Sequence, residues 1–272
     1  MFENSKNRCR VSLFVLLMLA GFVLCAQAMN NSHGKNEDES TPDPNQVQDS
    51  NVFTADFNIE SLKFVPLGVN PYFILKPCYQ LVLEGQDGNE VVHVEITVLP
   101  KTKVIQIQGI GKVTTRIVLE QEWVDDELVE ESRNFFAISK KTNDVFYFGE
   151  EVDIYEDGNV VSHDGSWLAG KDGAMPGIIM PGTFLLGSKY YQEIAPDVAL
   201  DRAEHIAMGL TIDTEAGTFD DSVEILETTP LEPGAESIKQ YARGIGLIND
   251  DGVELVDYGF VKHCGCIKKN KD

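Results

Sequence analysis

Residues 79–98 read YQLVLEGQDGNEVVHVEITV, and this stretch decides the fold. Apolar and polar residues alternate in both halves, and Asp87 and Gly88 mark the break between them, which is the pattern of a β-hairpin. One face of the second half carries four apolar residues, Val92, Val94, Ile96 and Val98. His93 falls on the other face, and no second His or Cys has a matching position, so we expect a solvent-side strand residue rather than a metal ligand.

The same alternation recurs along the rest of the chain. It occupies residues 114–123, 128–139, 145–149, 152–155, 160–162, 203–214, 222–229, 236–242 and 253–260. Turn residues separate these runs, so the sequence predicts an all-β protein in which the strands follow one another as an antiparallel meander. A sheet of about ten or more strands cannot stay flat, and we expect a half-barrel, a barrel or a sandwich. Residues 199–207 are the exception, because they also fit one or two helical turns.

The chain has 272 residues, of which 43% are hydrophobic. This is enough to bury a sizeable core. We predict a single β domain over residues 52–262, or two packed halves divided near residues 162–196.

The N-terminus has the pattern of an export signal. Lys6, Arg8 and Arg10 precede an apolar run at residues 11–25. Small residues follow, and we expect cleavage after Ala28. The run is shorter than the about 20 residues that span a bilayer, so no stable membrane anchor is expected after cleavage.

Two further expectations concern the start of the chain. Anchoring through Cys25 as a lipoprotein is a rival interpretation, although Leu24 is bulky where a small residue is required. Residues 29–51 contain almost nothing apolar and are predicted to form a disordered tether, with His33 a solvated residue within it.

The chain is strongly acidic. Its formal net charge is −22, and loss of the predicted leader, which carries +2, leaves −24. Such a charge disfavours nucleic acid and anionic lipid, and it favours cationic partners or divalent ions. The simpler explanation is that it keeps an exported protein soluble.

Residues 162–196 interrupt the strand pattern with glycine and proline, so we expect them to cross or close the sheet. The segment is rich in large apolar residues, namely Trp167, Met175, Ile178, Ile179, Met180, Phe184, Tyr190 and Tyr191. They either fill the open end of the sheet as core or line a cavity for an apolar small molecule or a lipid.

Six carboxylates lie in or beside the same segment: Asp164, Asp172, Glu193, Asp197, Asp201 and Glu204. Oxygen ligands of this kind suit calcium, but the spacing is not that of an EF-hand, and solvated loop acids are the alternative. Glu193 with Asp201 or Glu204 also offers the two carboxyl groups that a hydrolase needs.

Three cysteines remain after loss of the leader: Cys78, Cys264 and Cys266. An oxidising compartment favours a disulfide, and all three pairings are open at this point, although Cys264 with Cys266 would close a strained ring. Residues 263–272 form a basic tail that includes His263, so this group is also a candidate site for Cu(I) or Zn(II).

Several blocks resemble a widespread family of exported bacterial proteins that has no established activity. These blocks are FYFGEE at 146–151, GSWLAGKDGAMPGIIMP at 165–181, YQE at 191–193 and TPLEPG at 229–234. The similarity extends over about residues 70–247. It implies an extracytoplasmic location and a β-rich fold, with no activity to transfer.

The sequence therefore leaves three classes of function. The first is an exported, non-enzymatic binding or carrier protein for an apolar or amphipathic ligand. The second is a structural or adhesive envelope protein, and the third is a carboxylate-based hydrolase. We favour the first and expect no cofactor, with calcium as the alternative.

Overall fold

The computed structural model describes residues 52–264. Within this range the chain forms antiparallel β-strands and a single 3-10 turn, η1 (Ile59–Ser61), and no α-helix. The all-β prediction is therefore confirmed. The predicted leader, the tether and Cys266 lie outside the described residues.

The strands form one sixteen-stranded sheet. Their bounds are β1 (Phe64–Val65), β2 (Tyr79–Asp87), β3 (Glu90–Ile107), β4 (Gly111–Val124), β5 (Glu127–Ser139), β6 (Val145–Glu156), β7 (Asn159–Ser162), β8 (Trp167–Leu168), β9 (Met175–Met180), β10 (Lys189–Tyr191), β11 (Glu193–Ile194), β12 (Arg202–Thr214), β13 (Gly217–Thr228), β14 (Glu236–Ala242), β15 (Gly246–Asp250) and β16 (Val253–Phe260). The main path runs β10-β12-β13-β14-β15-β16-β2-β3-β4-β5-β6-β9-β11, so the C-terminal strand β16 lies beside β2.

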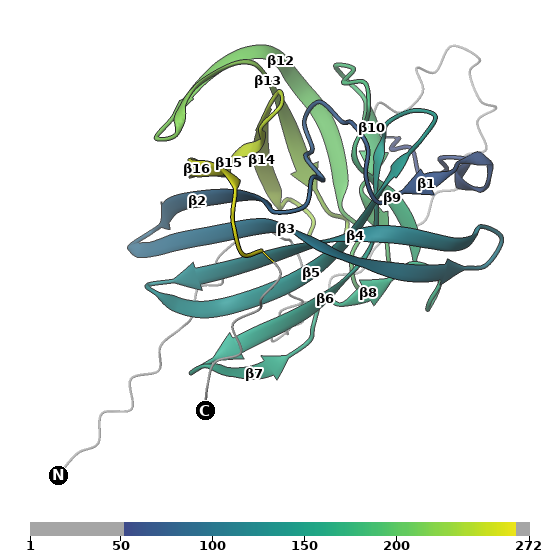
Figure 1. Ribbon diagram of the computed structural model, residues 1–272, viewed down its shortest axis with the longest axis horizontal. Helices are drawn as coiled ribbons and strands as arrows, with labels where there is room; N and C mark the ends of the chain where they lie inside the picture. The colour runs from purple at the N-terminus through teal and green to yellow at the C-terminus, as the bar shows by residue number, and fades with distance from the viewer. Residues whose placement is uncertain (1–51, 265–272) are drawn as a thin grey trace, which may run out of the picture.

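The sheet is curled, so it has an inner and an outer face. In Figure 1, β3 to β6 form the lower side and the β12–β13 hairpin arches above them. The β12–β13 ladder has register irregularities at three places, between residues 205 and 207, 208 and 210, and 210 and 212. Irregularities of this kind bend a strand and increase its local twist, which a sheet of this size needs in order to curl.

The glycine-rich crossover, residues 162–196, supplies the strands at both ends of the main path, β10 and β11. β10 pairs with β12 at one end and β11 pairs with β9 at the other, and Gln192 is the single residue between them. The hydrogen-bonded ladder does not close into a barrel. Gly177 on β9 allows this arrangement, because a side chain there would clash with the backbone of Tyr191 and Gln192.

Strand β6 is buried on both faces. Phe57 and Phe64, from the segment before β2, pack edge-on against Phe146 at ring distances of 5.8 and 5.1 Å. Tyr147 points to the opposite, inner face, where it stacks on Phe136 at 4.8 Å. This double burial explains why residues 145–148 are apolar without alternation.

A disulfide joins Cys78, just before β2, to Cys264, just after β16. One of the three predicted pairings is thus confirmed, and a bond of this kind is typical of oxidising compartments. Cys264 is then not a free thiolate, which removes a ligand from the predicted soft-metal site. In the described residues no helix has the length and hydropathy needed to cross a membrane.

The helical alternative for residues 199–207 is wrong. The chain enters β12 at Arg202, which pairs with both β10 and β13. Ala203 and His205 are buried and alternate with the more exposed Arg202 and Glu204, as expected for a strand. Pairing with two neighbours outweighs the local helical tendency of the alanines.

Candidate functional site

The inner face of the curled sheet encloses a cavity of about 110 Å³. Its aromatic and aliphatic lining comprises Tyr72, Phe73, Ile74, Tyr79, Leu81, Ile96, Val98, Val118, Phe136, Tyr147, Ile179, Tyr241, Ile245 and Leu247. Its polar lining comprises Glu120, Asn134, Lys239 and Asp250. The cavity is therefore apolar on most sides and charged on one.

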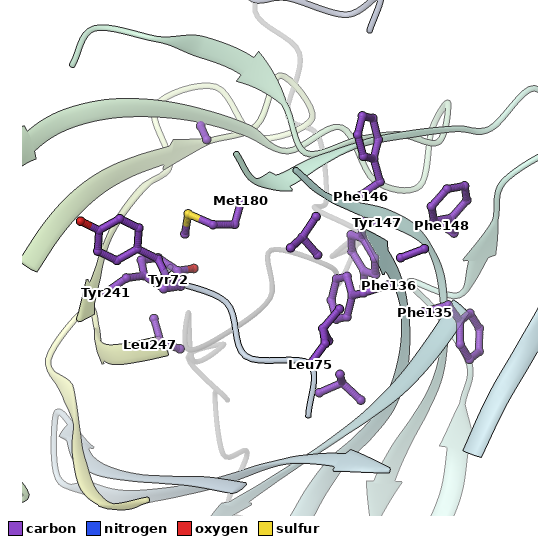
Figure 2. Close-up of a cluster of buried hydrophobic side chains, with 14 of the residues drawn as sticks. Tyr72, Leu75, Phe135, Phe136, Phe146, Tyr147, Phe148, Met180, Tyr241 and Leu247 are labelled. Atoms are coloured by element: carbon purple, nitrogen blue, oxygen red, sulfur yellow. The ribbon is translucent and has the colours of Figure 1, made fainter. Parts of the chain in front are cut away.

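Aromatic rings from three parts of the chain build the apolar wall. Phe136 lies between two of them, 5.0 Å from Phe73 and 4.8 Å from Tyr147. Figure 2 shows Phe136 and Tyr147 on one side of the interior, with Tyr72 and Tyr241 on the other. The Tyr147 hydroxyl donates to Asn134 Oδ1 at 2.5 Å, so the polar end of the ring is satisfied inside the protein.

The segment with Tyr72 and Phe73 is held in place by Asn70. Asn70 Nδ2 donates to the carbonyl oxygens of Asn143 and Pro181 at 3.0 and 3.1 Å. Its Oδ1 accepts the backbone N–H groups of Tyr72 and Phe73 at 2.9 and 3.0 Å. One buried amide thus fixes the segment that runs through the interior, which follows from the need to satisfy buried polar groups.

Lys239 is the centre of the charged side. Its Nζ lies 2.7 Å from Glu227 Oε2 and 3.5 Å from Asp250 Oδ2. Burial alone would lower the pKa of Lys239, but the two carboxylates outweigh it and raise that pKa well above its usual value. Lys239 is therefore charged and already paired on two sides.

Asp250 is almost fully buried, with 1% of its surface exposed. Its Oδ1 accepts the Ser237 hydroxyl at 3.2 Å, whereas its Oδ2 has no hydrogen-bond donor and only the longer ion pair with Lys239. Burial raises the pKa of Asp250 to about 6, although Lys239 counteracts it. The cavity wall therefore contains a carboxylate oxygen with unused capacity to accept a hydrogen bond.

Three glutamates continue the charged side towards the β4–β5 turn. Glu120 and Glu122 lie on β4 and Glu130 on β5, and the charges of Glu122 and Glu130 both act on Glu120. Burial, and then the charge of Glu130, raises the pKa of Glu122 to about 8. Burial raises the pKa of Glu130 to about 7 and that of Glu120 well above its usual range.

A second group of carboxyls lies where β6 meets the crossover. The backbone N–H of Asp201 donates to Glu193 Oε1 at 2.7 Å. Glu150 is 1% exposed, and neither of its carboxylate oxygens has a hydrogen-bond partner. Burial raises the pKa values of Glu193 and Glu150 well above their usual range and that of Asp201 to about 7.

A larger pocket of about 370 Å³ opens beside the crossover. Its polar lining comprises Lys103, Glu150, Glu151, Ser166, Lys171 and Asp172. Trp167 also lines it, and the indole Nε1 has no hydrogen-bond partner. Most of the charged lining is exposed or already paired, as in the ion pair of Lys103 with Glu151.

The structure separates the predicted apolar ligand-binding residues. Ile179 lines the inner cavity and Trp167 the outer pocket. Met180, Phe184 and Tyr190 are buried, Tyr191 lies near Phe53, and Met175 is exposed. Most of them therefore serve as core, which was one of the two expected roles.

Phe184 and Tyr190 enclose a histidine that was not singled out from the sequence. Phe184 stacks on His205 at 3.7 Å, and the Tyr190 hydroxyl lies 2.8 Å from His205 Nε2. His205 Nδ1 lies 3.0 Å from the Leu185 carbonyl oxygen and donates to it, so Nε2 accepts from Tyr190. Burial lowers the pKa of His205 to about 4, so the ring is neutral.

The six predicted calcium ligands do not come together as a group. Glu193 and Asp201 are buried and adjacent, while Glu204 pairs with Lys189 at 3.0 Å. Asp164, Asp172 and Asp197 are exposed. Among residues 52–264 no three His, Cys, Asp or Glu side chains are placed so that they could hold a metal ion.

The sequence did not lead us to identify Lys239, Asp250 and Glu120 as site residues. The only signal was their position along the strand, since Lys239 shares a strand face with buried Tyr241 and Glu120 shares one with buried Val118. Comparison with known proteins found no matching family model, no significantly similar curated protein and no significantly similar solved structure. The resemblance to exported bacterial proteins stays a prediction.

Proposed function

We propose that this chain is an exported, non-enzymatic binding protein that holds a small amphipathic ligand in its inner cavity. The observation that carries the proposal is the division of the cavity into an aromatic wall and a charged side. Ligand pockets commonly combine a mainly apolar lining with a few polar groups that fix the orientation of the ligand. The apolar part would pack against Phe73 and Phe136, and the polar end would meet Glu120, Lys239 and Asp250.

Export to the periplasm or the medium is part of this proposal. It is supported by the basic and apolar pattern of residues 1–28. It is supported further by the Cys78–Cys264 disulfide, because such bonds persist in oxidising compartments.

The size of the cavity favours a small molecule over a lipid. Its volume of about 110 Å³ is below the about 150 Å³ of an engineered cavity that takes up benzene. We expect the buried part of the ligand to be no larger than a short alkyl chain or a small ring.

A carboxylate-based hydrolase has less support. Glu193 and Asp201 are adjacent, as that function would need, but their exposed fractions are only 2% and 8%. A general acid or base must come within hydrogen-bond reach of a substrate. Binding in the inner cavity does not require these two groups to be accessible.

The proposal is tested by filling the cavity. Val118 lines it and is 3% exposed, so Val118→Phe should occupy the space while the fold is retained. Native mass spectrometry of the exported wild-type protein should show a retained small molecule, or thermal shift assays should show stabilisation by 1-butanol or n-butylamine. Both effects should be lost in Val118→Phe.

Val104→Phe is the matched control, because Val104 lies on β3 and is 56% exposed. It makes the same change of side chain outside the cavity and should leave ligand retention and thermal shifts as in the wild type. An apo mass together with no thermal shift for either probe would show that the cavity is not a binding site.

A further inference from the structure

We propose that the cavity selects a small primary amine, whose ammonium group binds on the charged side against Glu120 and Asp250 while its alkyl part packs on the aromatic wall. This inference rests on the proposed binding function and names its ligand class. The side-chain charges, the unused acceptors and the size of the cavity support it separately.

The first support is the imbalance of charge around the cavity. The titratable groups of the interior come from several strands. These are Tyr79 from β2, Glu120 and Glu122 from β4, Glu130 from β5, Tyr147 and Glu150 from β6, Glu193 from β11, Asp201, Glu227 from β13, Lys239 and Tyr241 from β14, and Asp250 from β15. Lys239 is the one cation in this set of eight carboxyl groups, of which Glu120 and Asp250 line the cavity itself.

The second support is that Lys239 forms its ion pairs with Glu227 and Asp250 rather than with Glu120. Its ammonium is held by Glu227 at 2.7 Å and Asp250 at 3.5 Å. Gln192 Nε2 donates to the other oxygen of Glu227 at 2.5 Å, which fixes that carboxylate towards Lys239. Glu120, on β4, is not a partner in these ion pairs, and the charge of Lys239 lowers its pKa against the larger effect of burial.

The third support is that the site offers unused hydrogen-bond acceptors. Asp250 Oδ2, buried in the cavity wall, accepts no hydrogen bond and has only the 3.5 Å ion pair with Lys239, and Glu120 offers two further acceptor oxygens. An ammonium group has three N–H donors and no acceptor, so it matches this arrangement. A carboxylate ligand would instead place a like charge beside Glu120 and Asp250, which is unfavourable in a site of low dielectric.

An organic cation fits better than a metal ion. Among residues 52–264 no three acidic, His or Cys side chains have the placement that a metal requires. The aromatic wall offers no ligand atoms to a metal ion. It does provide a surface against which an alkyl chain packs, and the faces of Phe136 and Tyr147 attract a cation. The cavity volume of about 110 Å³ limits the ligand to a short chain.

Binding of an amine should be linked to release of protons. Burial raises the pKa values of Glu122 to about 8 and of Glu130 to about 7, so these groups hold protons at neutral pH. A bound ammonium stabilises the ionised carboxylates and displaces those protons. An alkylammonium, like that of lysine, keeps its charge up to about pH 10. The affinity for an amine should therefore rise between about pH 6.5 and 8.5.

The experiment uses three probes that share one alkyl chain: n-butylamine, 1-butanol and butyrate. Isothermal titration calorimetry of the complete mature protein at pH 7 and pH 8.5 should show that n-butylamine binds at least tenfold more tightly than 1-butanol. Butyrate should not bind. The affinity for n-butylamine should be higher at pH 8.5, with proton release visible as a dependence of the heat on the buffer.

Glu120→Gln tests the assigned contact, because it keeps the shape of the side chain and removes its charge. It should weaken n-butylamine at least tenfold and change 1-butanol by less than about twofold, since charge-assisted hydrogen bonds are the stronger ones. Glu127→Gln is the matched control: Glu127 is exposed at the start of β5, and its removal changes the net charge equally without touching the cavity.

The outcomes separate this inference from the proposed function. If 1-butanol binds as well as n-butylamine, and Val118→Phe abolishes both, the cavity binds ligands but does not select amines. If no probe binds, the proposed function itself is wrong. The pH dependence and the proton release are measured on the wild type, so they decide the question even if Glu120→Gln fails to fold.

Discussion

Glu122 on β4 and Glu130 on β5 lie directly opposite each other in the register of the two strands. Two like charges in this position repel each other, and a cross-strand pair of this kind destabilises a sheet when both groups are ionised. The chain nevertheless places the pair on the inner face, next to Glu120. The interior is thus built to be stable with protons, or another cation, present.

The first prediction is that the folded state loses stability as the pH rises from 6.5 to 8. In this range the folded protein retains protons on Glu122, with a pKa of about 8, and on Glu130, with a pKa of about 7. The unfolded chain has already lost them, since an ordinary glutamate has a pKa of about 4.3. The free energy of unfolding should fall by about 1 to 3 kcal/mol per pH unit, measured by urea unfolding.

Two checks isolate the cause. The low pKa of His205, about 4, affects stability only below about pH 6.5, where the unfolded imidazole gains a proton, so the window avoids it. Glu130→Gln should reduce the slope, and Glu127→Gln should not. A free energy of unfolding that stays constant from pH 6.5 to 8 would contradict the prediction.

The second prediction concerns Lys239. Lys239→Met removes the cation that pairs with Glu227 and Asp250 and leaves their buried charges unpaired, which should cost about 3 to 5 kcal/mol of stability at neutral pH. Lys189→Met, which breaks the more exposed pair with Glu204, should cost about 1 kcal/mol or less. Chemical denaturation of the two variants in parallel makes the comparison.

A double variant tests the reason for the loss. Asp250→Asn added to Lys239→Met should recover part of the stability, because it removes one of the two stranded charges. Equal losses for Lys239→Met and Lys189→Met would mean that the inner ion pairs are as well solvated as the outer one.

The third prediction concerns the disulfide. Cys264→Ser should lower the free energy of unfolding by about 2 to 5 kcal/mol under oxidising conditions, since the Cys78–Cys264 bond closes a long loop. Cys266→Ser, outside the described residues, should have little effect. Thermal unfolding with and without reductant measures this, and the idea fails if Cys266→Ser is the more harmful change.

The fourth prediction concerns Trp167. Its ring is 6% exposed and packs edge-on against Tyr147 at 5.2 Å, so Trp167→Ala should cost about 3 to 5 kcal/mol. Trp123 is less buried and contacts His93 at 5.3 Å, and Trp123→Ala should cost clearly less. The midpoints of thermal unfolding test this order, and a reversed order would show that Trp167 is not part of the core.

Much of the fold follows from local patterns in the sequence. The Asp87–Gly88 turn and its flanking alternation give the β2–β3 hairpin, and the same logic gives the hairpins that follow. The strand at Arg202 was only partly foreseen, because alanines fit a helix as well as a strand. Pairing with its two neighbours, β10 and β13, makes this segment a strand, and such pairing cannot be predicted from the sequence of a single segment.

The candidate site was less accessible to sequence reasoning. On strand β4 the charged residues Lys112, Arg116, Glu120 and Glu122 share one face, and the other face carries Ile117 and Leu119, so the alternation does not reveal that Glu120 and Glu122 point inwards. The partners of Lys239 come from β13 and β15, and only the curl of the sheet brings this group near β4 and β5. Long-range placement, rather than residue type, creates the site.

The irregular β12–β13 ladder has a consequence for self-association. β12 pairs with β10 at residues 202–204, and the backbone of His205 also bonds to Gly187 and Ser188. Beyond His205 its outer edge is open to another chain and carries exposed Met208. An open, regular and apolar edge would invite strand addition and aggregation. The three irregularities, together with Gly209 at a φ of 70°, interrupt the even spacing of N–H and C=O groups along that edge. A second copy therefore finds no regular row of partners there, and the same distortions that curl the sheet also protect it from aggregation through this edge.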